Sequence, residues 1–158
     1  MSYPLLPIFL FAILFALAGP ALAKRSFEER YALAEKHRSS GNFSEALREY
    51  TSLVKVRPAD SRMHANLGAV LVRTGKLKEG KEEIDKAIML NEEDPAAHKA
   101  MATYYMFCKD KGKARMEYAR ATALEPGQNE PASDLQNFLG LAPSRTPAQK
   151  PKRKGHVQ

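Results

Sequence analysis

The sequence predicts an all-α fold, an α-solenoid of three helix-turn-helix repeats closed by a C-terminal capping helix. Three observations support this fold class. Residues 27–128 hold a pattern that returns every 34 residues without gaps. Within each copy, apolar residues lie three or four positions apart, which is the spacing of one helix face. A turn divides each copy into two short helices, and so small a pair cannot bury its apolar face unless it packs against neighbouring copies.

The central copy, residues 61–94, shows the pattern most clearly. Its turn lies at Thr74-Gly75-Lys76, where glycine permits a sharp change of direction. The apolar stripes on either side of the turn predict one amphipathic helix before it and one after it. Their residues are Leu67, Val70 and Leu71 before the turn, and Leu77, Ile84, Ala87, Ile88 and Leu90 after it.

Small and large residues share equivalent positions in the three copies. A small residue at such a position allows two helices to touch closely, and a large residue four positions on fills the space beside the contact. Proline closes the first and third copies, where a helix must stop. The equivalent sets are Leu33, Leu67 and Met101; Ala34, Gly68 and Ala102; Ala46, Gly80 and Ala114; Tyr50, Ile84 and Tyr118; and Leu53, Ala87 and Ala121, with Pro58 and Pro126 at the ends.

This period and alternation resemble the tetratricopeptide repeat (TPR) family. The resemblance implies a right-handed superhelix over residues 27–140, with repeats at 27–60, 61–94 and 95–128. The third copy departs from the family pattern at its turn, where Lys109 and Lys111 stand in place of glycine and an aromatic residue. The residues that carry the resemblance are Leu33-Ala34, Gly41, Phe43, Ala46, Tyr50 and Pro58; then Leu67-Gly68, Gly75, Ala87 and Leu90-Asn91; then Tyr105, Ala114, Tyr118, Ala121 and Pro126.

The second copy also departs from the family, because it has Gly80 where alanine is usual. Glycine inside a helix costs roughly 1 kcal/mol relative to alanine. We therefore expect Gly80→Ala to raise the melting temperature, unless a neighbouring helix needs the gap.

The first segment, residues 1–23, is apolar and contains no charged side chain. Its core is too short for a comfortable membrane span, and Ala21-Leu22-Ala23 has the small residues of a signal peptidase site. We expect a cleavable secretory signal that ends at Ala23, and therefore an exported protein that is periplasmic or secreted. The alternative is an uncleaved membrane anchor that holds the repeats outside the cytoplasm.

Helix starts can be placed along the repeats. Asn42 or Ser44 is expected to cap the second helix of the first copy. Asp60 or Ser61 caps the next helix. Asp94 followed by Pro95 begins the third pair, with the aspartate as N-cap and the proline in the first turn.

Two further segments follow the repeats. Residues 131–140 predict a short capping helix, with Leu135 and Phe138 facing the last repeat, because an uncapped apolar face would meet water. Residues 142–158 are rich in Pro, Ser, Lys and Gln and are expected to be a disordered basic tail.

The positive charge is concentrated in that tail. The formal net charge is +7, while residues 143–158 carry five cations and no acid, which leaves +2 for the rest of the chain. Such a tail can contact an anionic membrane surface or a cell-wall polymer. The residues concerned are Lys150, Lys152, Arg153 and Lys154.

Nothing in the sequence predicts an enzyme. There is no Gly-rich phosphate loop, no GxSxG and no HExxH motif, and we expect no cofactor and no metal site. His64 and His98 share a repeat position, but two ligands do not make a metal site, and packing histidines are expected there. The single cysteine, Cys108, excludes an internal disulfide and is expected to be a small buried residue.

The resemblance places the candidate binding site in a concave groove lined by the first helix of each pair. Arg62, Asn66 and Arg73 share one helix face away from Leu67, and Lys99 and Thr103 do so in the next copy. Asn66 matches one residue of the family's carboxylate clamp, but Tyr31 and Glu35 stand where its lysine and second asparagine belong, so that clamp is not predicted. The expected groove residues are Tyr31, Arg62, Asn66, Arg73, Lys99, Thr103, Met106 and Phe107, together with Glu35, Arg38 and Ala69.

We therefore expect a non-catalytic protein-interaction module. Its groove would bind an extended or helical segment of a partner protein, with acidic side chains or a carboxyl end, and the chain would act as a scaffold or assembly factor in the cell envelope. Nucleic acid is not expected as a partner of an exported protein. The alternative is a membrane- or polymer-associated structural protein that works through the basic tail. The oligomeric state is not predicted.

Overall fold

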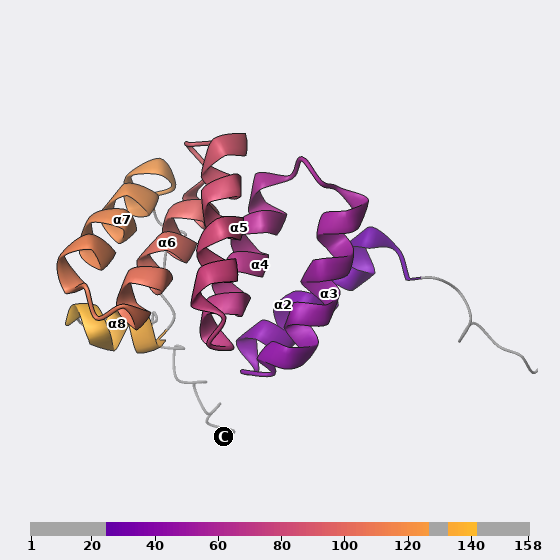
Figure 1. Ribbon diagram of the computed structural model, residues 1–158, viewed down its shortest axis with the longest axis horizontal. Coiled ribbons are helices and arrows are strands. Elements are labelled where there is room, and N and C mark those ends of the chain that lie inside the picture. The colour runs from indigo at the N-terminus through magenta and orange to yellow at the C-terminus, as the bar shows by residue number, and fades with distance from the viewer. Residues whose placement is uncertain (1–24, 127–132, 142–158) are drawn as a thin grey trace, which may run out of the picture.

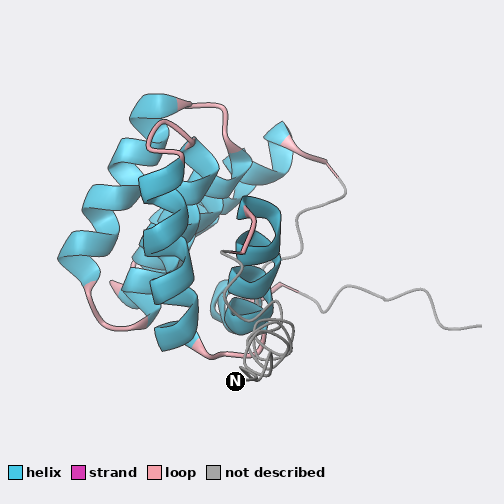
Figure 2. Cartoon of the chain, turned by 90° about the vertical axis from the view of Figure 1, so that its right-hand side faces the viewer, coloured by secondary structure: helices cyan, strands magenta, loops and turns pink. Residues whose placement is uncertain are grey.

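The computed structural model describes residues 25–126 and 133–141, and these contain seven helices and no strand (Figures 1 and 2). The predicted all-α fold is confirmed. The expected signal segment, the expected basic tail and the first two residues of the expected capping helix lie outside the described residues. None of the described helices is long and apolar enough to cross a membrane. The helices are α2 (Phe27–Ser39), α3 (Phe43–Val56), α4 (Ser61–Arg73), α5 (Leu77–Leu90), α6 (Pro95–Phe107), α7 (Lys111–Leu124) and α8 (Ser133–Leu139).

The helices form three consecutive pairs, α2 with α3, α4 with α5 and α6 with α7 (Figure 1). Successive pairs stack side by side, and α8 packs against α6 and α7 at the C-terminal end. The spacing of the first helices is uneven. Helix α4 packs directly on α6, whereas α2 makes few close backbone contacts with α4 and reaches it mainly through α3. A cleft therefore opens between α2 and α4.

The small positions predicted from the repeat are the places where helices touch. Ala34, Ala46, Ala102 and Ala114 are fully buried. The large positions beside them fill the core, since Tyr50, Leu53 and Ile84 are also fully buried. The exception is Tyr118, which is only partly buried. The repeat pattern thus marks the helix contacts correctly.

Helices α4 and α5 approach each other most closely at Gly68 and Gly80. A methyl group added to Gly80 would lie 2.7 Å from Cγ2 of Val72 and 2.9 Å from the carbonyl oxygen of Gly68. One added to Gly68 would lie 2.6 Å from Cγ1 of Ile84. Gly80 is therefore a contact glycine, and the exception stated for it applies, because the neighbouring helix needs the gap.

The turns inside the first two pairs use glycine in the left-handed region, with φ of 76° at Gly41 and 84° at Gly75. The third pair places Lys109 there, with φ of 60°. A non-glycine residue in this region costs about 1–2 kcal/mol. The departure from the family pattern at this turn is thus kept at an energetic cost.

Most of the predicted caps are present. The Asp60 side chain accepts a hydrogen bond from the backbone N–H of Met63, and Asp94 accepts one from Ala96 ahead of Pro95 in the first turn. Asn42 stands at the N-cap of α3, but its side chain makes no capping hydrogen bond, so that expectation is wrong for Asn42.

His64 and His98 each join the two helices of their own repeat to the end of the preceding repeat. Nδ1 of His64 lies 2.6 Å from a carboxylate oxygen of Glu83, and Nε2 lies 2.9 Å from the carbonyl oxygen of Pro58. His98 repeats this with Glu117 at 2.8 Å and the carbonyl of Glu92 at 2.8 Å. Both ring nitrogens of each histidine are thus occupied, which gives them a packing role. Among the described residues no group of three metal-ligating side chains occurs.

Cys108 departs from its expected burial. It is the C-cap of α6 and is exposed, because the helix ends there and the chain turns outward into the left-handed Lys109.

The Gly68–Gly80 contact gives a stability prediction. We expect Gly80→Ala to lower the free energy of unfolding by about 2 kcal/mol, because the new methyl group meets backbone atoms that cannot move aside. Thermal unfolding followed by circular dichroism measures the effect.

The matched control is Gly112→Ala. Its added methyl group would meet only a carboxylate oxygen of Asp110 at 3.6 Å, so alanine should stabilise α7 by up to about 1 kcal/mol. Equal gains at both positions would contradict the close contact.

Candidate functional site

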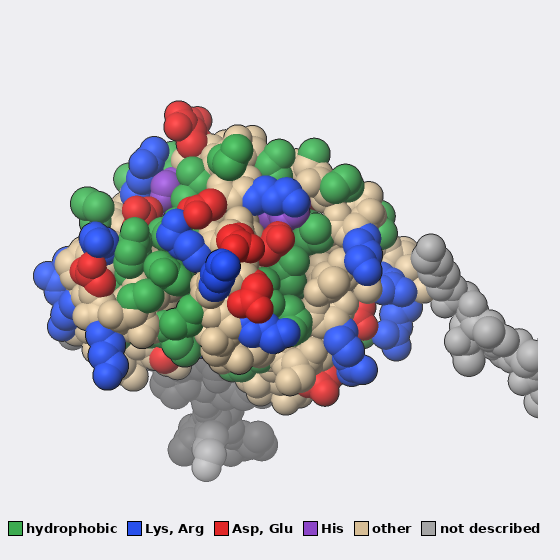
Figure 3. All heavy atoms as spheres, in the orientation of Figure 1, with side chains coloured by type: hydrophobic (Ala, Val, Ile, Leu, Met, Phe, Trp, Pro, Cys, Tyr) green, Lys and Arg blue, Asp and Glu red, His purple; other side chains and the backbone are tan. Residues whose placement is uncertain are grey.

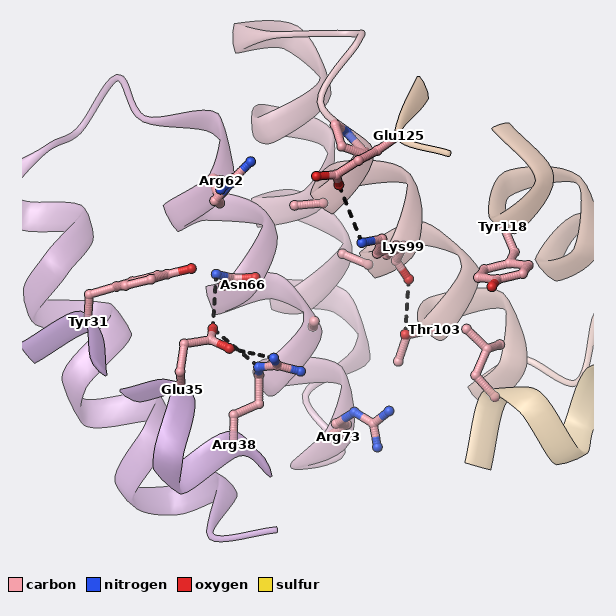
Figure 4. Close-up of a pocket in the computed structure, with 15 residues that line it drawn as sticks. Tyr31, Glu35, Arg38, Arg62, Asn66, Arg73, Lys99, Thr103, Tyr118 and Glu125 are labelled. Carbon is pink, nitrogen blue, oxygen red and sulfur yellow. Dashed lines mark hydrogen bonds and ion pairs between the residues drawn. The ribbon is translucent and has the colours of Figure 1, made fainter. Parts of the chain in front are cut away.

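A cleft of about 470 Å³ opens between α2, α4 and α6 and extends to α7 and α8 (Figure 4). Its walls are mostly polar. In Figure 4 the Tyr31, Glu35 and Asn66 side chains point into the space between α2 and α4, and Arg62 and Arg73 lie at opposite ends of α4. The lining residues are Tyr31, Glu35, Arg38, Arg62, Asn66, Ala69, Arg73, Pro95, Ala96, Lys99, Ala100, Thr103, Tyr118, Glu125 and Leu135.

Most of the residues predicted for the groove lie in this cleft. Tyr31, Arg62, Asn66, Arg73, Lys99 and Thr103 line it, as do Glu35, Arg38 and Ala69. That they bind a partner stays a prediction.

Met106 and Phe107 do not line the cleft. Met106 packs against the core beneath α8, and Phe107 is 39% exposed at the end of α6. Met106 is kept from the cleft because it packs against the cluster that contains Leu135 and Leu139 of the capping helix.

The sequence did not predict that Tyr118, Glu125 and Leu135 would line the cleft. These side chains come from α7, from the residue after it and from α8, whereas the resemblance points only to the first helix of each pair. Glu125 lies 26 positions after Lys99, which is not the repeat period, so the sequence gave no signal that the two would meet.

The Glu35 carboxylate holds three helices together at one side of the cleft. It accepts hydrogen bonds from Arg38 Nη2 at 2.5 Å and Nε at 3.3 Å, from the hydroxyl of Tyr50, and from Nδ2 of Asn66 at 3.5 Å. Tyr50 is on α3 and Asn66 on α4, so the carboxylate links both helices to α2.

These contacts determine the protonation states of Glu35 and Tyr50. Burial raises the pKa of Glu35, but the hydrogen bonds from Arg38 and Tyr50 outweigh it, so the pKa lies below its ordinary value. Burial and the Glu35 carboxylate together raise the pKa of Tyr50, which therefore stays neutral and donates its proton.

The opposite side of the cleft contains a second ion pair. Nζ of Lys99 lies 3.8 Å from a carboxylate oxygen of Glu125. Burial lowers the pKa of the Lys99 amine against the opposing pull of Glu125, and the Arg62 and Arg38 cations lower it further. The hydroxyl of Thr103 donates to the backbone carbonyl of Lys99 at 3.0 Å, so its oxygen remains able to accept a hydrogen bond.

Arg62 differs from the other cleft cations. It is exposed, and within the described ranges it has neither an ion pair nor a hydrogen bond. Tyr31 directs its hydroxyl toward Asn66 beside it (Figure 4). Arg38, Arg73 and Lys99 each have a carboxylate partner in Glu35, Asp134 and Glu125. Arg62 is therefore the cleft cation that an anionic ligand can bind without displacing a carboxylate of the described residues.

The Glu35 network predicts a pH dependence. With its folded-state pKa below the ordinary value of 4.5, the carboxylate stabilises the fold at neutral pH, and that contribution is lost as the pH falls below about 4.5 and through the lowered pKa. Urea unfolding of the unaltered chain and of Glu35→Gln should differ most at pH 7, and the difference should shrink toward pH 3. A difference that stays constant with pH would contradict the network.

Residues 37–104 match a family model described as tetratricopeptide repeat. Among curated proteins, Hsp70-Hsp90 organizing protein 3 of Arabidopsis thaliana is 27% identical over 105 residues, which is 62% of this chain and 19% of that protein. U-box domain-containing protein 70 of Oryza sativa subsp. japonica is 35% identical over 80 residues, which is 44% of this chain and 10% of that protein. The chain therefore spans less than a fifth of the length of these relatives.

Solved structures show the same fold. The first TPR of Spaghetti (RPAP3) bound to the HSP90 peptide SRMEEVD superposes with a TM-score of 0.56 at 19% identity and covers 72% of this chain and 89% of that one. PcrH in complex with the chaperone binding region of PopD superposes with a TM-score of 0.55 at 20% identity, and the match covers 75% of this chain and 94% of that one.

Proposed function

We propose that the described helices form a tetratricopeptide-repeat domain and that its cleft binds an extended, acid-bearing segment of a partner protein. The single observation that carries the proposal is the exposed Arg62, which has no ion pair with any residue that the structure describes and lies beside the polar side chains of Tyr31 and Asn66. A carboxylate entering the cleft there gains a charge-assisted hydrogen bond that displaces no internal partner.

The cleft selects against one kind of ligand. Glu35 occupies the α2 wall as an ionised carboxylate tied to Arg38, so an acidic group placed beside it meets repulsion. The partner's carboxylate is therefore directed to the end of α4 at Arg62 and toward Lys99 on α6. This differs from a clamp that grips a carboxylate from both helices α2 and α4.

Two similar structures support the general mode of binding. The Spaghetti domain holds an HSP90 peptide with acidic residues, and PcrH holds a segment of PopD. The interaction needs no catalysis, and we propose a scaffold or assembly role.

Binding of an acid-bearing peptide tests the proposal. A fluorescein-labelled SRMEEVD peptide is titrated with the full chain by fluorescence anisotropy, beside a peptide with glutamine at both glutamate positions. We expect the acidic peptide to bind more tightly. Arg62→Glu with Lys99→Glu should weaken binding by about tenfold or more, because like charges then face the ligand.

Lys78→Glu with Lys86→Glu is the matched control. Both lysines are exposed on α5, where cations and acids alternate on the surface (Figure 3) and no residue lines the cleft. A chain truncated after Ala142 should bind as the full chain does. If truncation abolishes binding and the Arg62/Lys99 change does not, the basic tail is the active part and the cleft proposal fails.

We also propose that the chain acts outside the cytoplasm, in the cell envelope. The support is the uncharged apolar segment 1–23 with its small residues before Lys24. Intact-mass analysis of the protein from fractionated host cells tests this. A mass that begins at Lys24 in the periplasmic or secreted fraction is expected. A full-length mass in the membrane means an uncleaved anchor, and a full-length mass in the cytosol overturns export.

A further inference from the structure

Arg73, which lines one end of the cleft, already binds a carboxylate of this chain. Asp134, on α8, accepts hydrogen bonds from Arg73 Nη1 at 2.5 Å and Nη2 at 3.0 Å, which is a bidentate pair. The two residues are 61 positions apart in the chain and belong to α4 and α8. Burial raises the pKa of Asp134, but the hydrogen bond and charge of Arg73 outweigh it, so its pKa is below the ordinary value and the pair is ionic at neutral pH.

Helix α8 does not need this pair to stay in place. Leu135 is 2% exposed and Leu139 is fully buried, both in a cluster with Ala102 and Ala114. Arg115 also donates to the carbonyl of Leu139 at 2.8 Å. The Asp134 side chain, by contrast, is 42% exposed, so solvent reaches the carboxylate that covers Arg73.

Arg73 would remain in position without Asp134. Its guanidinium lies 5.3 Å from the centre of the Phe43 ring, and its side chain is only 14% exposed. The cation therefore faces the cleft from a fixed place, whichever carboxylate it binds.

The separation of the two arginines of α4 determines how far apart two acidic groups must be to reach both of them. Arg62 and Arg73 are 11 positions apart on one face of the helix, which corresponds to about 16 Å along its axis. An extended chain advances about 3.3 Å per residue and points alternate side chains to opposite faces, so two acids on one face that bridge this distance lie about six residues apart.

We propose that the partner segment carries two acidic side chains about six residues apart on one face, one for Arg62 and a second that displaces Asp134 from Arg73. This inference rests on the proposed function and deepens it. Asp134 is then an internal competitor that lowers the affinity for such a segment while α8 stays docked. A segment with a single acid binds at Arg62 and does not meet this competition.

Two peptides with blocked ends are the probes. The first, Ser-Glu-Ala-Thr-Ala-Thr-Ala-Glu-Ser, has its two acids six positions apart and on one face when extended, and the second has glutamine in place of the second glutamate. Each is titrated with the full chain and with Asp134→Asn, which keeps an oxygen for the backbone N–H of Leu135. We expect Asp134→Asn to bind the two-acid peptide about fivefold more tightly. The one-acid peptide should change by less than about twofold on the same basis.

Asp85→Asn is the matched control. It is the same chemical change, and it removes a carboxylate that accepts from Lys81 at 2.5 Å on α5, away from the cleft. It should leave both affinities unchanged. Adding Arg73→Gln to Asp134→Asn should remove the fivefold gain.

A spectroscopic readout on the unaltered chain does not depend on any substitution. The side-chain carboxyl carbon signal of Asp134 should shift as the two-acid peptide is added and should stay still with the one-acid peptide. A signal that does not move with the two-acid peptide would overturn the competition.

The outcomes separate the two proposals. Equal binding of the two-acid peptide by the unaltered chain and Asp134→Asn overturns the competition and leaves the proposed function standing. A gain for both peptides, or an equal gain with Asp85→Asn, reflects total charge and also overturns the competition. No binding of either peptide by any variant overturns both proposals.

Discussion

The structure depends on the close crossing of α4 and α5 at Gly68 and Gly80. Because neither glycine has a side chain, Val72 and Ile84 are drawn into the core beside the crossing and are fully buried. The crossing fixes the rotation of α4, the helix that has neighbours on both sides. Arg62, Asn66 and Arg73 project from its opposite face into the cleft. A glycine contact on one side of a helix thus sets the direction of three polar side chains on the other.

The sequence was sufficient for the helices and their contacts because the repeat records them. A small residue that returns at Ala34, Gly68 and Ala102 reports a packing constraint that every copy meets in the same way. The same periodicity could not predict the role of residues at which the copies differ. Gly80 stood out as a poor helix residue, and only the position of Gly68 across from it shows why it is kept. The exposure of Cys108 likewise depends on where one particular helix ends.

The cleft was harder to predict than the fold because its ion pairs join residues that no local pattern relates. Glu125 reaches Lys99 from beyond α7, and Asp134 reaches Arg73 from α8. Helix-face spacing identified the cations on α4 and α6, but not the carboxylates that neutralise two of them. Met106 lies outside the cleft because it packs against the cluster of the capping helix, and the repeat pattern contains no record of that helix. Phe107 also lies outside the cleft and is exposed at the end of α6.

These internal carboxylates decide what kind of ligand the cleft can select. A cleft lined only with free cations binds any polyanion, and its affinity reflects total charge. Here Glu35, Glu125 and Asp134 each hold one cation, so a ligand gains from those positions only by replacing a contact that already exists. Glu35 is held from three helices and is the hardest to replace, whereas Asp134 is the most exposed of the three. In the proposed mode of binding, selectivity arises from the order in which a ligand reaches the cations. Arg62, which has no ion pair among the described residues, lies at one end of α4, and Arg73 at the other end is reached only through competition.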